Sequence, residues 1–139
     1  ALRAAGLGAC HPAIERACAW LLARQRPDGA WAEDPSSCLK GRYVEHPEGL
    51  VTTTAWATLA LLVAGDPDPA ATDRGAGFLQ QRRRDDGSWP DEGPAGVFFE
   101  TALLDYALYR QIFPAWALTL HQRRRASTPI SLSPVERLR

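Results

Sequence analysis

The sequence predicts an all-α fold built from paired helices. Apolar residues recur at helical spacing in several stretches, and Pro and Gly residues separate these stretches. Residues 16–31 (RACAWLLARQRPDGAW) align without a gap with residues 74–89 (RGAGFLQQRRRDDGSW), at an offset of 58 residues. Each copy is followed by a loop and a more apolar helix, so we infer an internal repeat of helix hairpins. Stacked hairpins form an α-solenoid or a closed α/α toroid, and this chain has too few of them to close a ring.

The composition indicates one neutral domain. At 139 residues the chain is long enough to bury a core, and its 16 basic and 16 acidic residues leave no net charge to attract nucleic acid. No apolar stretch is long enough to span a bilayer, and no signal peptide opens the chain. The 3 cysteines are widely spaced, which predicts reduced thiols. Because Met is absent even at position 1, we expect this sequence to be a piece of a longer product or an incomplete gene model.

The first helix is predicted over residues 12 to about 25. Pro12 suits a first helical position because its ring fixes a helical φ and that position needs no donor. An apolar stripe follows: Ile14, Ala17, Cys18, Leu21 and Leu22. The Pro-Asp-Gly sequence at 27–29 ends this helix, and Trp31 closes the turn. Further Gly and Pro residues predict an irregular stretch up to about residue 49.

The second helix is predicted over residues 52–64. Three consecutive threonines, Thr52, Thr53 and Thr54, offer hydroxyls that could cap its N-terminus. The residues that follow are apolar nearly all round, which predicts burial on every side. We therefore predict that Trp56 is a core residue rather than a cavity residue. Gly65 ends the helix.

A third helix is predicted over residues 69 to about 83, with Asp68 as its N-cap. A central, aromatic-rich helix is predicted next, on the spacing of Phe98, Phe99, Ala102, Leu103, Tyr106, Tyr109 and Phe113. On such a helix Phe99 and Tyr106 would share one face, with Phe98 and Tyr109 on a neighbouring face. It would fill a core or wall an apolar pocket. Pro114 would then open a last helix that ends near residue 125.

Both repeats resemble the QW motif of the triterpene cyclases, the family of squalene–hopene and oxidosqualene cyclases. In that motif a basic residue, an aromatic and aliphatics precede a Gln and a Gly-x-Trp sequence. Gln25 and Trp31 match it in the first copy, and Trp89 matches it in the second, where Arg83 stands in the place of the Gln. The stretches WAEDPSSCLKGRYVEH, TTTAWATLALLVAGDPD and GVFFETALLDYALYRQIFPAWAL are similar to the last part of an oxidosqualene cyclase. EDPSSC and GRYV favour that branch, and the resemblance covers about residues 9–118.

This resemblance implies a reaction and a set of partners. Enzymes of the family cyclise 2,3-oxidosqualene or squalene through carbocations to a sterol or triterpene skeleton, without a metal or an organic cofactor. The implied partners are an apolar C30 substrate and, for the full-length enzyme, a membrane or lipid-droplet surface, with no nucleic acid. Residues 1–125 would be the C-terminal segment of an α/α toroid domain, and residues 126–139 a disordered tail.

The resemblance also assigns roles to individual residues. Phe98 and Tyr106 would line the substrate cavity, with Tyr109 as a supporting hydroxyl, because ring faces stabilise a cation without quenching it. Trp31 and Trp89 would tie helices together. The family's acid motif is absent, so the chain carries no initiating acid, and Asp105 lies at a position that the family does not use as its acid.

Two other interpretations stay open. The chain could be a non-catalytic α-solenoid binding or scaffold module, in which the aromatic helix packs a core and no cavity exists. It could also resemble the toroid of the prenyltransferase β subunits, but their zinc-binding His would fall at Thr53 or Thr54, and His11, His46 and His121 have no ligand spacing. Cys38 could tune an acid nearby, or be a small buried thiol.

Overall fold

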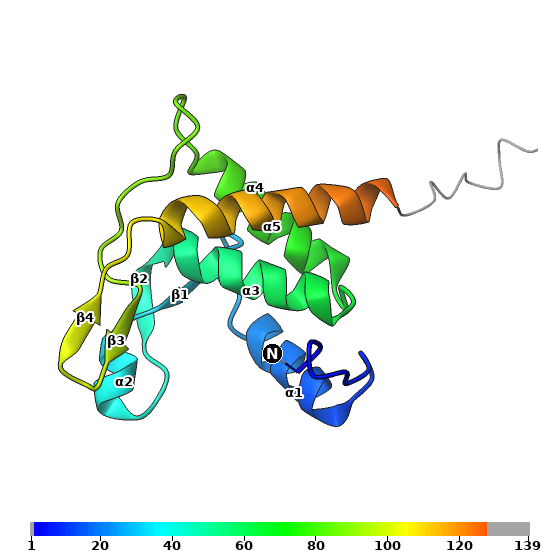
Figure 1. The fold of residues 1–139 in the computed structure, drawn as a ribbon, viewed down its shortest axis with the longest axis horizontal. Helices are drawn as coiled ribbons and strands as arrows, with labels where there is room; N and C mark the ends of the chain where they lie inside the picture. The colour runs from blue at the N-terminus through cyan, green and yellow to red at the C-terminus, as the bar shows by residue number, and fades with distance from the viewer. Residues whose placement is uncertain (1, 128–139) are drawn as a thin grey trace, which may run out of the picture.

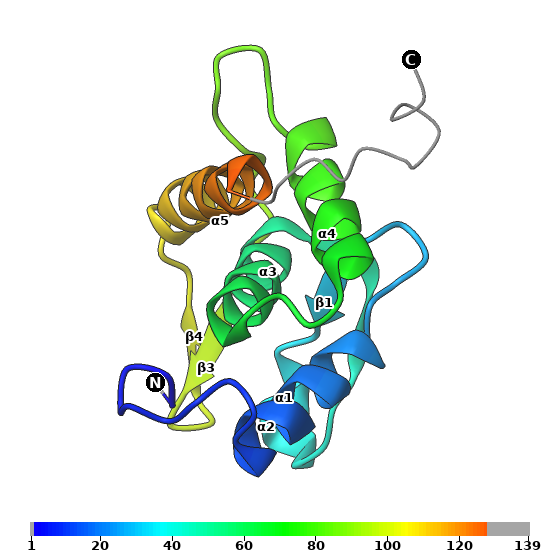
Figure 2. The same cartoon turned by 90° about the vertical axis from the view of Figure 1, so that its right-hand side faces the viewer.

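Five helices and two small sheets make up the part of the chain that the computed structural model describes, residues 2–127. The helices are α1 (Pro12–Leu22), α2 (Ser36–Lys40), α3 (Val51–Ala64), α4 (Pro69–Gln81) and α5 (Tyr109–Ala126). The strands are β1 (Trp31–Glu33), β2 (Glu45–Leu50), β3 (Gly96–Phe98) and β4 (Ala102–Leu104). Helix α3 lies at the centre, in contact with α1, α4 and α5 (Figures 1 and 2).

Helices α1, α3 and α4 confirm three of the helices predicted from the sequence. Pro12 and Pro69 begin α1 and α4, and the Asp68 carboxylate accepts a hydrogen bond from the Ala71 N–H at 3.1 Å, as expected of an N-cap. Gly65 follows α3 in a left-handed conformation, φ 113°, which a residue with a side chain adopts at a cost.

The start of α3 differs from the prediction. Thr53 and Thr54 do not cap the helix; their hydroxyls donate to the carbonyl of Trp31 at 2.7 and 3.2 Å. Glu92 acts as the cap instead, because its Oε2 accepts a hydrogen bond from the Val51 N–H at 2.5 Å. A carboxylate at a helix N-terminus also interacts favourably with the helix dipole.

The core consists of two clusters on either side of α3. One lies toward α4 and α5 and contains Ala30, Val51, Ala55, Leu59, Phe78, Leu79, Trp89 and Ala117. The other lies toward α1 and contains Ile14, Cys18, Trp31, Ala57 and Leu61. Each cluster therefore contains the Trp of one repeat. The prediction that α3 is buried on every side holds for most of its residues, but Ala60 and Val63 are exposed.

Two small sheets, which the sequence did not predict, accompany the helices. Strands β1 and β2 pair antiparallel within the stretch expected to be irregular, with Trp31 opposite Leu50. The Tyr43 hydroxyl donates to the Ala32 carbonyl at 2.8 Å, which joins the loop before β2 to β1. The Arg26 side chain supports β2 by donating from Nη2 to the backbone carbonyl of Pro47 at 3.0 Å. These bonds link residues distant in the chain, so local residue patterns do not reveal them.

The predicted aromatic helix is also wrong. Strands β3 and β4 form an antiparallel hairpin in which Phe98 lies opposite Ala102. Phe99 and Glu100 turn the chain with left-handed φ angles of 49° and 60°. Helix α5 begins only at Tyr109 and runs through Pro114, which is buried inside it rather than opening it. Phe98, Tyr106 and Tyr109 therefore do not share one helix.

The far end of α5 is held by charged residues. Arg125 pairs with Asp66 at 2.9 Å and with Asp73 at 2.7 Å, and His121 Nε2 lies 2.7 Å from the same Asp73 carboxylate. Desolvation alone would raise the pKa of Asp73, but the hydrogen bonds from His121 and Arg125 together outweigh it, and the pKa is lowered. Helix α5 includes Ala126, which was expected in the tail, and the rest of the predicted tail from residue 128 lies outside the described residues. None of the helices within residues 2–127 has the length and apolarity needed to cross a bilayer.

Candidate functional site: tryptophan turns and an aromatic wall

The two repeats make the same tertiary hydrogen bond. Trp31 donates from Nε1 to the Leu21 carbonyl at 2.8 Å, and Trp89 donates from Nε1 to the Leu79 carbonyl at 2.9 Å. Both donors and both acceptors are separated by the offset of the sequence repeat, 58 residues. The two indoles are 4% and 5% exposed. Each donates to a carbonyl in the last turn of the preceding helix, where the backbone carbonyls have no N–H partner within the helix.

The turns that precede these tryptophans have the same backbone. Gly29 and Gly87 adopt left-handed φ angles of 86° and 85°. Arg26 N–H donates to the Ala30 carbonyl at 2.9 Å, and Arg84 N–H donates to the Ser88 carbonyl at 2.8 Å. At Gly29 a Cβ atom would lie 2.5 Å from a carbonyl oxygen of α4, so the turn requires glycine for space as well as for φ.

Gln25 and Arg83 differ in what they join. Gln25 donates from Nε2 to the carbonyls of Gly29 and Ala71, at 3.0 and 2.8 Å, and its Oε1 accepts from Arg74 at 2.5 Å. It thus connects the first turn to α4. Arg83 donates from Nε to the equivalent turn carbonyl, at 3.0 Å. Arg83 therefore reproduces the bond within the turn.

Five aromatic side chains from α3, α5 and the segment before α5 form a continuous strip, which we call the aromatic wall: Trp56, Tyr106, Tyr109, Phe113 and Trp116. Tyr109 lies at its centre, with ring centroids 5.8 Å from Trp56, 5.1 Å from Tyr106 and 5.3 Å from Phe113, all in edge-to-face arrangements. Tyr106 is 49% and Trp116 54% exposed, so the wall is open to its surroundings.

Trp56 is not a core residue, contrary to the prediction. It is half-buried and lines three cavities, of about 280, 430 and 210 Å³. On α3 it shares a face with Thr53, Ala60 and Val63, none of which is fully buried. Because this face is almost as apolar as the rest of the helix, the sequence contains no polarity signal that separates it from the core.

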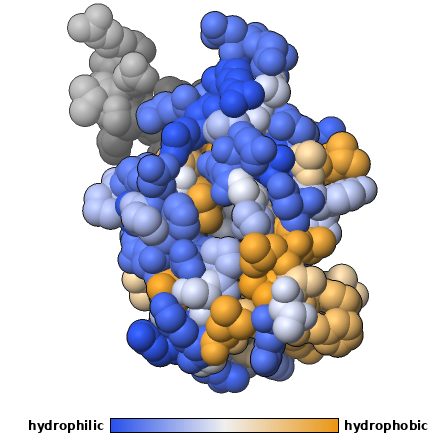
Figure 3. Space-filling model, turned by 90° about the vertical axis from the view of Figure 1, so that its left-hand side faces the viewer, coloured by the Kyte–Doolittle hydropathy of each residue, from blue (hydrophilic) through white to orange (hydrophobic). Residues whose placement is uncertain are grey.

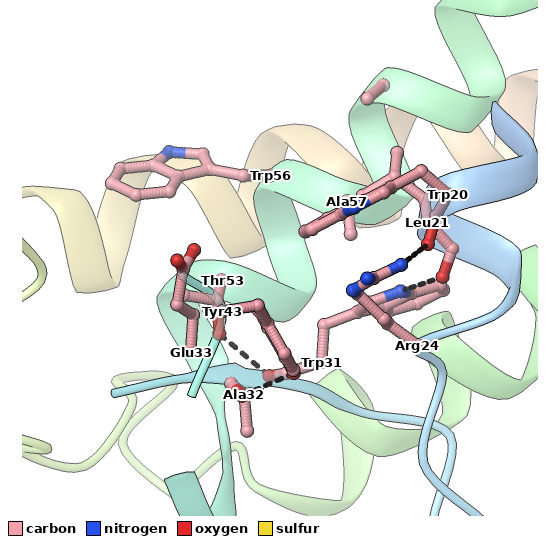
Figure 4. A pocket seen from close by; sticks show the side chains of 11 residues that line it. Trp20, Leu21, Arg24, Trp31, Ala32, Glu33, Tyr43, Thr53, Trp56 and Ala57 are labelled. Atoms are coloured by element: carbon pink, nitrogen blue, oxygen red, sulfur yellow. Dashed lines mark hydrogen bonds between the residues drawn. The ribbon is translucent and has the colours of Figure 1, made fainter. Parts of the chain in front are cut away.

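The cavity of about 280 Å³ lies between α1, α3 and the β1–β2 sheet (Figure 4). Aromatic side chains line much of it: Trp20, Trp31, Tyr43 and Trp56. Arg24 lies at its side, with the guanidinium carbon 3.9 Å from the Trp20 ring centre and 5.1 Å from that of Tyr43. Burial raises the pKa of Tyr43, and nearby carboxylates add to that shift.

Tyr106 and Tyr109 are brought together, whereas Phe98 is not part of the aromatic wall. Phe98 lies in β3, is 60% exposed, and its ring packs on Phe99 at 4.2 Å between centroids. The hairpin and Trp56 are nevertheless neighbours, because Ala95, Gly96 and Val97 line the cavity of about 210 Å³ together with Trp56.

The sequence singles out one acidic group and one thiol near the aromatic wall, Asp105 and Cys38. Asp105 forms an ion pair with Arg110. Cys38 is exposed, so the expectation of a buried thiol is wrong, and all three cysteines are free. Within residues 2–127 no group of three His, Cys, Asp or Glu residues could hold a metal ion.

Large apolar side chains are exposed around the hairpin. They include Phe98, Phe99, Leu103, Leu104 and Leu108. Figure 3 shows hydrophobic residues gathered on the lower half of the face that carries the hairpin. Contiguous exposed apolar surface is typical of regions where proteins contact other molecules.

Comparison with known proteins identifies relatives over most of the chain. The family model described as "Squalene-hopene cyclase C-terminal domain" matches residues 1–123. Human lanosterol synthase is 41% identical over 76% of this chain, and Saccharomyces cerevisiae lanosterol synthase ERG7 is 36% identical over 79% of it. Squalene–hopene cyclase of Zymomonas mobilis is 34% identical over 94%.

These alignments cover 14%, 15% and 20% of the relatives' own lengths, so the chain spans only a small part of each. The resemblance found in the sequence is thereby confirmed: this chain belongs to the squalene–hopene cyclase C-terminal domain family.

Proposed function

We propose that this chain is the C-terminal portion of a class II triterpene cyclase, which converts 2,3-oxidosqualene or squalene to a sterol or triterpene skeleton through carbocations. Residues 1–125 would form a segment of an α/α toroid. The segment supplies part of the cavity wall and two tryptophan turns, and the initiating acid comes from elsewhere in the longer polypeptide. The observation that carries this proposal is the open aromatic wall beside three cavities around Trp56.

The chemistry of the wall suits a carbocation. A cation over the face of an aromatic ring gains about 0.5–2 kcal/mol, and the ring offers no lone pair that would trap it. The edge-to-face contacts of Tyr109 hold neighbouring rings in fixed orientations. Several such rings in sequence would stabilise positive charge as it moves along a folded polyene. No metal or organic cofactor takes part in this proposal.

The names of the relatives agree with this substrate class. Lanosterol synthases and squalene–hopene cyclases are named for sterol and triterpene products. A substrate that is a C30 hydrocarbon or its epoxide partitions into lipid, so we propose that the full-length enzyme associates with a membrane or lipid-droplet surface.

Phe98 provides the test of the cavity role. In the full-length polypeptide, incubated with squalene or 2,3-oxidosqualene, Phe98→Ala is expected to change the product distribution while leaving stability nearly unchanged. The side chain is 60% exposed in this segment, and substitutions at such sites usually change the free energy of unfolding by no more than about 0.5 kcal/mol. Products are identified by gas chromatography and mass spectrometry.

Leu39→Ala is the matched control, because Leu39 is 63% exposed and lies on α2 rather than on the hairpin or the wall. It is expected to leave the products unchanged. A Phe98→Ala enzyme with unchanged products and a lowered melting temperature would show that Phe98 is a packing residue. Absence of cyclic product from the unmodified full-length polypeptide would refute the proposed function itself.

The exposed apolar surface around the hairpin favours a second candidate, a non-catalytic binding or scaffold module. The same incubation distinguishes the two. Saturable binding of squalene with no cyclic product would support the binding module.

A further inference from the structure

We propose that Arg110 is a positioning residue that fixes the β3–β4 hairpin against α5, and with it Tyr106 and Phe98. This inference rests on the proposed function. Arg110 lies in the first turn of α5, and its side chain is 10% exposed. Its Nη1 lies 3.3 Å from Asp91 Oδ1 and also donates to Asp105 Oδ1. One buried cation thus contacts two carboxylates.

The positions of these carboxylates in the chain give the contact its consequence. Asp91 precedes β3 and Asp105 follows β4 directly, so both ends of the segment that contains the hairpin meet at one guanidinium. Each strand has 3 residues, and a two-stranded hairpin of this size has little stability of its own. The hairpin therefore depends on contacts at its base.

Two neighbouring contacts hold the base of the segment on the core. Gln111, the next residue of α5, accepts from the Trp89 N–H at 3.2 Å and donates to the Trp89 carbonyl at 3.3 Å. Glu92 accepts from the Val51 N–H at 2.5 Å. The stretch from Trp89 to Glu92 is thus fixed to α5 and to α3, and Arg110 extends this attachment across to Asp105.

Asp105 connects this attachment to the aromatic wall. It is adjacent to Tyr106, whose ring lies 5.1 Å from that of Tyr109. If Asp105 loses its partner, the backbone before Tyr106 is free to move, and so are the strands that carry Phe98. Rings that take several positions stabilise several cations, so more than one product would form. A group placed wrongly by about 1 Å can cost about 100-fold in rate.

The experiment uses the full-length polypeptide with Arg110→Gln and Arg110→Lys. In Arg110→Gln we expect a lower kcat with little change in KM, a smaller share of the main product, and faster hydrogen exchange of the backbone amides in β3 and β4. Arg110→Lys keeps the charge and is expected to restore most of the product distribution. Asp105→Asn, at a carboxylate that is 49% exposed, tests the same contact with less risk to folding.

Arg125→Gln is the matched control. Arg125 lies at the other end of α5 and also pairs with two carboxylates. The Arg125→Gln variant therefore loses two similar ion pairs but leaves the contacts of the hairpin intact. It is expected to lower the melting temperature while products and hairpin exchange stay unchanged.

The outcomes separate this inference from the proposed function. Hydrogen exchange is measured with or without turnover, and unchanged exchange of β3 and β4 in Arg110→Gln would overturn the inference even in an inactive protein. Faster exchange with an unchanged product distribution would also overturn it, because Arg110 would then be structural only. Failure of the unmodified polypeptide to cyclise either substrate would refute the proposed function, whatever the exchange data show.

Discussion

Replacing the repeat tryptophans separates the contribution of the indole N–H from that of ring burial. Trp89 is 5% exposed, so Trp89→Ala in the full-length polypeptide is expected to lower the free energy of unfolding by about 3–5 kcal/mol. Trp89→Phe keeps most of the apolar contact but removes the donor to the Leu79 carbonyl, and leaving a buried acceptor unpaired costs about 1–3 kcal/mol. In Trp31→Phe the Leu21 carbonyl still accepts from the Arg24 N–H at 2.9 Å, so the loss should be smaller.

The assay is urea-induced unfolding followed by circular dichroism, combined with product analysis for each variant. We expect the order of loss to be Trp89→Ala, then Trp89→Phe, then Trp31→Phe, with an unchanged product distribution in all three. A loss below about 1 kcal/mol for Trp89→Ala would refute the staple role, since truncating a buried Trp to Ala costs about 3–5 kcal/mol. Redirected products at full stability would instead make Trp89 a cavity residue.

Three further substitutions, at Glu92, Gly75 and Gly77, test the cap of α3 and the packing of α4. Burial raises the pKa of Glu92 above its ordinary 4.5, so this carboxyl contributes stability below pH 4.5, and that contribution is lost as pH rises through the raised pKa. The amide oxygen of Glu92→Gln can still accept from the Val51 N–H, so in urea titrations this variant should gain stability relative to the unmodified protein as pH increases. The opposite pH dependence would show that the interaction of the carboxylate with the helix dipole outweighs the effect of burial. Gly75→Ala in α4 would place a Cβ 2.6 Å from Thr58 Oγ1 and should cost about 1–3 kcal/mol. Gly77→Ala in the same helix would place its Cβ more than 4 Å from any packed neighbour and should gain about 0.5–1 kcal/mol. Equal melting temperatures of the two variants would contradict this packing argument.

Local signals in the sequence predicted helices α1, α3 and α4. Pro12 and Pro69 mark the helix starts, and Gly65 marks an end. Short-range chemistry decides these boundaries, so a short stretch of sequence is sufficient to find them. The repeat added a long-range prediction, because equal residues at a fixed offset imply equal contacts, and the structure shows the same indole-to-carbonyl bond in both copies.

The aromatic segment failed for a physical reason. Between Phe98 and Phe113 the aromatic spacing fits a helix, but β-strand formers occupy the same positions and tertiary contacts decide between the two structures. The turn at Phe99 and Glu100 contains no Gly, Asn or Pro, the residues from which a turn is usually predicted. The ion pairs of Arg110 join residues up to 19 positions apart along the chain and produce no periodic pattern.

The candidate site residues were predicted from the resemblance to the triterpene cyclases, and local residue patterns added none. Tyr106 and Tyr109 do come together, although through a loop and a helix start rather than along one helix. Trp56 was assigned to the core because nothing in the composition of α3 distinguishes a lining face from a packed one. Which face of an apolar helix stays uncovered depends on its neighbours in space, and these are known only from the structure.

The difference between Gln25 and Arg83 changes which hydrogen-bonding partners each turn can bind. An amide donates and accepts at once, so Gln25 closes its own turn and also receives the guanidinium of Arg74 from the next helix hairpin. A guanidinium has no acceptor, so Arg83 closes its turn but cannot receive a second arginine. A group that hydrogen-bonds to Arg83 must therefore be an acceptor, whereas α4 presents both an acceptor, the Ala71 carbonyl, and a donor, the Arg74 guanidinium, to Gln25.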